Sequence, residues 1–153
     1  MGRCSCGAVH YRMTASPVFV HACHCTWCQR ETGSAFALNA MIETEFVDLL
    51  AGVPEEMTLP SASGRGQIVL RCGVCRVALW SHYAGAGRKV AFVRVGTLEK
   101  PGACPPDIHI FTSTKLPWVV LDGWVPVVPE YYDWREHWPA SSIARREAMA
   151  TKR

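Results

Sequence analysis

The chain has 153 residues, of which 49% are hydrophobic, and carries a formal net charge of +3. This length allows one domain with a substantial core but hardly two, and the composition excludes an intrinsically disordered chain. No apolar stretch approaches the ~20 residues of a membrane-spanning helix, and no secretory apolar segment follows Met1. We therefore expect a cytoplasmic protein without a membrane partner.

Short apolar or alternating segments between turn residues predict a mainly β fold of short antiparallel strands. A short helix is expected from Thr26 to Thr32, with Gly33 as its left-handed C-cap. The strands are expected at residues 9–13, 18–21, 36–42, 67–71, 77–80, 89–95, 108–111 and 118–121.

The C-terminal segment differs in composition from the rest. We expect one domain over residues 1–133 and a basic helical tail over 134–153, capped at Ser141 or Ser142 and solvated along its length. The tail carries the net positive charge, and the remaining basic and acidic residues balance. Because no basic stripe spreads over the body of the chain, we expect no nucleic-acid partner.

Eight cysteines are the most informative feature of the composition. In a small secreted protein they would indicate disulfides, but here they gather in tight clusters in a chain expected in the cytoplasm. Cysteines two residues apart, such as Cys4 and Cys6, cannot readily bond to each other. Clustered cysteines in this context indicate metal binding or catalysis.

Cys4-x-Cys6 and Cys72-x-x-Cys75 predict a closed, structural zinc site. In an extended segment Cys4 and Cys6 would point to one face, and a Cys-x-x-Cys knuckle also presents two sulfurs together. Four thiolates in tetrahedral geometry leave no free position on the metal. A thioredoxin-like redox pair is the alternative, but its βαβ context is missing around Cys72.

Cys23, Cys25 and Cys28 form a second group within one short segment. Three protein ligands and an open position are typical of catalytic zinc. Cys104, His21 or His24 would close the site as a fourth ligand, although strand alternation should turn His24 away from Cys23 and Cys25. We favour the open site.

The motifs together resemble the glutathione-dependent formaldehyde-activating enzyme family, which shares its domain with centromere protein V. The matching motifs are Cys4-x-Cys6-Gly7, Cys23-His24-Cys25-x-x-Cys28, Arg71-Cys72-x-x-Cys75 and His109-Ile110-Phe111 with Lys115-x-Pro117-Trp118. The resemblance implies an all-β tent fold and two zinc ions per chain, with a thiol such as glutathione bound beside the second. The family usually has glycine where this chain has Arg76, which puts the geometry of that knuckle in question.

The resemblance implies a carbon–sulfur lyase that acts on adducts of a glutathione-like thiol with a small aldehyde such as formaldehyde. Arg30 and Arg76 are candidates to hold the carboxylates of the thiol, and Trp27 and Trp118 to wall its pocket. His109 is a candidate proton shuttle. For each of these residues a surface or core role is the alternative. The rival functions are a non-catalytic zinc module, which binds a protein partner or buffers zinc, and a thiol redox switch.

Overall fold

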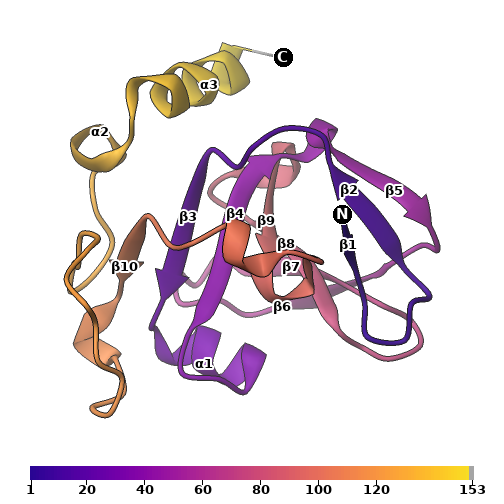
Figure 1. Cartoon of the computed structure of the whole chain (residues 1–153), viewed down its shortest axis with the longest axis horizontal. Coiled ribbons are helices and arrows are strands. Elements are labelled where there is room, and N and C mark those ends of the chain that lie inside the picture. Colours follow the sequence, from indigo (N-terminus) through magenta and orange to yellow (C-terminus); the bar gives the residue numbers. More distant parts are fainter. Residues whose placement is uncertain (152–153) are drawn as a thin grey trace.

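The computed structural model describes residues 1–151, so Lys152 and Arg153 of the predicted tail lie outside the described part. Within it, the strands form a three-stranded sheet of order β1-β2-β5 and a seven-stranded sheet of order β10-β3-β4-β9-β8-β7-β6 (Figure 1). The strands are β1 Gly2–Arg3, β2 His10–Met13, β3 Phe19–Cys23, β4 Ala37–Glu43, β5 Val47–Ala51, β6 Glu55–Leu59, β7 Gln67–Arg71, β8 Ala78–Tyr83, β9 Val90–Arg94 and β10 Ile108–Ile110. The helices are α1 Thr26–Thr32, α2 Trp134–His137 and α3 Ala140–Thr151, with single 3-10 turns η1 Thr44–Phe46, η2 Gly87–Lys89, η3 Val95–Thr97, η4 Pro101–Ala103 and η5 Thr112–Thr114. The predicted mainly β fold with a C-terminal helix is confirmed.

The seven-stranded sheet separates two apolar clusters. One register row, Val20–Ala40–Val93–Trp80, faces the small sheet, where the ring of Trp80 meets Tyr11 edge-on at 5.5 Å. The next row, which begins with Phe19 opposite Met41, faces the other way. It packs beneath α1 and the C-terminal segment. The two cysteine groups divide between these clusters: Cys4 and Cys72 belong to the first, and Cys23, Cys25 and Cys28 to the second.

The expectation of antiparallel strands holds except at one edge. β10 pairs with β3 in parallel, with Ile110 opposite Cys23. Strands β4 to β9 lie between β3 and β10 in the chain. Such a long connection lets β10 run in the same direction as β3, which a parallel pairing requires. The backbone of His109 is in turn covered by Pro126 and Val128, so this edge of the sheet is not left open.

One predicted strand does not form, and three strands that do form were not predicted. The strand expected at residues 118–121 is wrong: this segment is irregular, with Trp118 70% and Val120 89% exposed. The apolar run has no neighbouring strand to pair with, so its β propensity is not realised. Conversely, β1, β5 and β6 were missed, because they are very short or carry charged residues such as Glu55 and Glu56 at the sheet edge.

The C-terminal segment packs against the large sheet, so the expectation of a solvated tail is wrong for its described part. Trp138 is 6% exposed and stacks on Phe19 with ring centroids 5.3 Å apart. The guanidinium of Arg145 pairs with the carboxylate of Glu43. The predicted caps are also wrong: α3 begins at Ala140, and the Ser142 hydroxyl, inside the first turn, donates to the carbonyl oxygen of Val18 at 2.5 Å. None of the helices in residues 1–151 combines the length and apolar character that crossing a membrane requires.

If the C-terminal segment is part of the cooperative fold, Trp138→Ala should lower the free energy of unfolding by about 3–5 kcal/mol, as other buried aromatic truncations do. The matched control is Trp124→Ala, because Trp124 is 87% exposed and its loss should cost less than ~0.5 kcal/mol. Urea denaturation followed by circular dichroism measures both. Equal midpoints for the two variants would mean that residues 134–151 form a tail independent of the body.

Candidate metal centre

The first cysteine group comes together from two turns that are distant in sequence. Cys4 to Gly7 form a turn closed by the Gly7 amide and the Cys4 carbonyl, with Gly7 at φ +76°. The pair therefore sits on a turn and not on the extended segment expected from the sequence. Cys72 and Cys75 flank the turn between β7 and β8, closed by the Arg76 amide and the Cys72 carbonyl at 3.0 Å. All four sulfurs lie within 4.8 Å of one another.

The spacing of these sulfurs fits a tetrahedral ion. The Cys4 and Cys6 sulfurs are 3.5 Å apart, and those of Cys6 and Cys72 are 3.7 Å apart. Four sulfurs at ~2.3 Å from a central zinc would be separated by about 3.8 Å. The Val9 amide also donates to the Cys4 sulfur at 3.3 Å, which stabilises a thiolate. A backbone hydrogen bond from Val77 lowers the pKa of Cys75 to about 6. The donor set can hold a metal ion.

Arg76 adopts the backbone conformation that glycine would favour at this position. Its φ of +63° lies in the left-handed region, which costs a residue with a Cβ about 1–2 kcal/mol. The knuckle keeps its turn hydrogen bond nevertheless, and the Arg76 side chain pairs with the carboxylate of Glu55 on β6. The departure from the family motif therefore introduces strain without breaking the turn.

The second group is built at the junction of β3 and α1. Cys23 ends the strand, Cys25 is the N-cap of the helix, and Cys28 is its buried third residue. The Cys25 sulfur accepts the amide of Cys28 at 3.4 Å, so the thiol takes the role that Ser or Asp often has at a helix start. Gly33 ends the helix at φ +65°, which confirms the predicted helix and its C-cap. The three sulfurs lie within 4.8 Å of one another, and the three residues that carry them are buried.

Three sulfurs this close cannot all ionise without a cation. Hydrogen bonds from Cys23 and Cys28 lower the pKa of Cys25, whereas the hydrogen bonds with Cys25 and Cys28 raise the pKa of Cys23. One thiolate is stabilised by two protonated neighbours, because further negative charge nearby is disfavoured. A divalent ion among the sulfurs would remove this restriction and allow all three to act as thiolate ligands.

Within residues 1–151, no histidine, carboxylate or further cysteine joins this group of three. Cys104 packs against the first apolar cluster, on the other side of the sheet. His21 Nε2 is 2.7 Å from the Tyr132 hydroxyl. His24 turns away, as strand alternation predicts, and its Nε2 lies 2.9 Å from His109 Nδ1. All eight cysteines of the described chain are free thiols.

The remaining predicted site residues do not join the second group of sulfurs. His109 sits opposite Ala22 in the register, so it shares the His24 face of the sheet and not the Cys23 face. Burial lowers the pKa of both rings, to about 4 for His24. Trp27 is 39% exposed in the first turn of α1, and Arg30 is exposed in its last turn. Trp118 is exposed on the irregular segment after η5.

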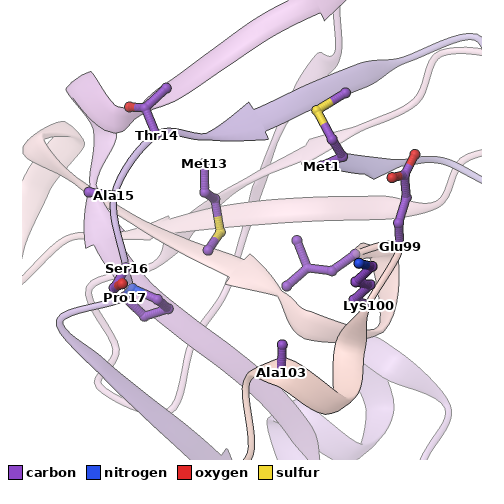
Figure 2. A pocket seen from close by; sticks show the side chains of 10 residues that line it. Met1, Met13, Thr14, Ala15, Ser16, Pro17, Glu99, Lys100 and Ala103 are labelled. Carbon is purple, nitrogen blue, oxygen red and sulfur yellow. The ribbon is translucent and has the colours of Figure 1, made fainter.

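A hollow of about 620 Å³ opens elsewhere, between the turn that follows β2 and residues 98–103. The side chains of Met13 and Ala103 point toward this space (Figure 2). No cysteine lines it, and its charged lining residues, Glu99 and Lys100, are exposed. The hollow therefore offers no chemistry that would make it the reactive site.

Sequence reasoning missed the polar residues beside the second group. Arg94 is 7% exposed, and its guanidinium donates to Glu31, Asn39 and Ser81. The available signal was the polar residue at an inward position of two otherwise apolar strands, Asn39 in residues 36–42 and Arg94 in 89–95.

The fold and the two sulfur clusters define a thiol-rich β protein whose cysteines could hold metal ions. Residues 1–114 match the sequence profile of the glutathione-dependent formaldehyde-activating enzyme family, and the chain belongs to this family. Membership suggests a lyase function related to glutathione and formaldehyde. A crystal structure of a Rhodobacter sphaeroides protein is similar, with a TM-score of 0.50 and 18% identity over 83% of this chain and 98% of that one. This likeness concerns the fold alone, and the search of curated proteins found no match.

Arg76→Gly should raise the free energy of unfolding by about 0.5–1 kcal/mol, because it relieves a left-handed φ. The ion pair with Glu55 that it removes is more than half exposed and worth less than ~1 kcal/mol. Arg76→Ala loses the same pair but keeps the strain, so it should be slightly destabilising. Chemical denaturation of the metal-loaded variants compares them. A glycine variant no more stable than the alanine variant would contradict this explanation.

Proposed function

We propose that the chain is a two-zinc carbon–sulfur lyase that acts on adducts of a glutathione-like thiol with a small aldehyde such as formaldehyde. Cys4, Cys6, Cys72 and Cys75 hold the structural ion. Cys23, Cys25 and Cys28 would hold a second ion, which would offer a binding position to the sulfur of the substrate. The observation that carries the proposal is the group of three clustered sulfurs without a fourth protein ligand in residues 1–151, in a chain of this family. We place the protein in the cytoplasm, where thiols stay reduced.

Zinc at the second site would provide a soft, weakly Lewis-acidic position at which a bound thiol loses its proton near neutral pH. The chain itself contributes three sulfurs, carried by a short strand and a capped helix. Strand β3 and helix α1 therefore fix the positions of the three sulfurs. In the synthetic direction the thiol sulfur bonds to the carbonyl carbon. The carbonyl π electrons move to oxygen, which takes up the proton that the thiol lost. The lyase direction reverses these steps and breaks the carbon–sulfur bond.

The roles of the outer residues form part of the same proposal. Arg30 and Trp27 lie on exposed positions of α1, where they can contact the peptide part of a glutathione-like thiol. Trp118 extends from the segment that follows β10. His109 and its partner His24 both face away from the sulfurs, so neither ring is placed to pass a proton to them directly.

Cys25→Ser is the sharpest test of the second site. Serine at this position can still accept the Cys28 amide and cap α1, so the fold should survive while one thiolate is lost. We expect the zinc content measured by mass spectrometry to fall from two ions per chain to one. The circular dichroism spectrum should stay unchanged.

Two matched cysteine variants complete this experiment. Cys72→Ser should unfold the protein or lower its stability severely, because the closed site supplies folding free energy. Cys104→Ser should keep both ions, since Cys104 belongs to neither cluster. Full zinc content in Cys25→Ser, or its loss in Cys104→Ser, would overturn the assignment of the ligands.

Glutathione should bind the second ion directly. In the cobalt-substituted protein, glutathione is expected to intensify the sulfur-to-cobalt charge-transfer absorption, and Cys25→Ser should abolish that change. Turnover of S-hydroxymethylglutathione, followed by release of formaldehyde, tests the reaction itself. Thiol binding without turnover would refute the lyase, and absence of both would favour the non-catalytic zinc module.

A further inference from the structure

A buried arginine lies on the same face of the large sheet as the second sulfur group. The register pairs Cys23 with Ala37 and Asn39 with Arg94, and residues opposite each other in an antiparallel pair share a face. Residues 37 and 39 of β4 also share a face, because they are two positions apart. Cys23, Asn39 and Arg94 therefore project from the same side, over which α1 carries Cys28 and Glu31.

Three side chains hold the Arg94 guanidinium in place. Its Nη2 donates to Glu31 Oε2 and to Ser81 Oγ, each at 3.0 Å, and its Nη1 donates to Asn39 Oδ1. The Arg94 and Glu31 side chains are 9% and 8% exposed. Among the described residues, Arg94 Nε finds no hydrogen-bond partner. A fixed, desolvated guanidinium of this kind is costly unless negative charge compensates it.

Glu31 alone does not balance the charge on this face. Its other oxygen, Oε1, pairs with Arg71 of β7, so one carboxylate serves two guanidiniums and a positive charge remains. The Tyr83 side chain also lies near the Arg94 guanidinium. Burial raises the pKa of Tyr83, so its phenol is neutral near pH 7. The sulfur group is thus the negative partner left to Arg94.

The net charge of the metal-loaded site also favours a positive charge nearby. A divalent ion with three thiolates has a net charge of −1, and a fourth thiolate from a substrate would make it −2. A water or imidazole ligand would add no charge. In a site shielded from solvent, this difference makes thiolate binding depend on nearby positive charge.

We propose that Arg94 is the counter-charge of the three-cysteine site and makes it selective for an anionic sulfur ligand over a neutral one. The inference rests on the proposed function, because it assumes a metal ion at Cys23, Cys25 and Cys28. Arg94 acts through the field of its guanidinium, which Glu31, Asn39 and Ser81 orient. It is a specificity-determining residue and takes no part in bond making.

The test compares two ligands on the full-length, cobalt-substituted protein. 2-Mercaptoethanol is the anionic sulfur probe, chosen because it has no carboxylate that an arginine would bind directly, and imidazole is the neutral probe. Arg94→Gln should weaken 2-mercaptoethanol binding about tenfold or more, because a buried counter-charge is lost, and change imidazole affinity less than about twofold. Arg94→Lys keeps the charge and should retain thiol affinity within about threefold.

Arg71→Gln is the matched control, since Arg71 pairs with the other oxygen of Glu31 but its side chain is 20% exposed against 9% for Arg94, so its charge is screened more by solvent. We expect it to leave the ratio of the two affinities unchanged. Cobalt at the four-cysteine site reports that each variant is folded. If Arg94→Gln does not fold, the comparison of Arg94→Lys with wild type decides: a thiol affinity lowered more than about threefold overturns the inference.

The outcomes separate the two proposals. No response of the wild-type protein to 2-mercaptoethanol would overturn the proposed function. A wild-type response that Arg94→Gln leaves unchanged, or that Arg71→Gln weakens equally, would overturn the role of Arg94 alone. Equal weakening would mean that the two arginines only hold Glu31 and α1 in place.

Discussion

Four sulfur atoms meet where the small sheet joins the large one, and they come from two turns that are 66 residues apart at the closest cysteines. The strands on either side of Cys4 and Cys6 are short: β1 has two residues and β2 has four. Two or three short strands are marginal in water without a covering layer or a cross-link. Metal binding at such a cluster can supply roughly 10 kcal/mol or more of folding free energy. An ion held by all four sulfurs would therefore fix the turn between β7 and β8 against the N-terminal turn.

This constraint extends to the second sulfur group through a chain of contacts. Arg71 precedes Cys72, and its Nη1 donates to the carbonyl oxygen of Arg76 inside the knuckle at 3.0 Å. Its Nη2 pairs with Glu31, one turn beyond Cys28 on α1. The knuckle of the four-cysteine group thus orients the helix that carries part of the three-cysteine group. The two sites lie on opposite faces of the sheet but share this support.

Much of the fold could be predicted because its signals are local. The spacing of the cysteines, the short helix ended by Gly33 and most of the central strands follow from neighbouring residues. What failed depends on distant partners. The apolar run at 118–121 finds no strand beside it, whereas Glu55 and Glu56 enter β6 because β7 offers an edge. The burial of Trp138 depends on Phe19, which is remote in sequence, so composition alone suggested a solvated tail.

The polar residues on the cysteine face are best understood by comparison with the opposite face. Val20, Ala40, Val93 and Trp80 form a wholly apolar row there. On the cysteine face, the adjacent positions Asn39 and Arg94 are polar, although they are 3% and 7% exposed. A buried ion pair is seldom more stabilising than apolar residues of the same size, so stability does not explain this choice. The polar residues are explained by a site whose net charge becomes more negative when it binds its ligand. The buried guanidinium then compensates the negative charge of the thiolates beside it.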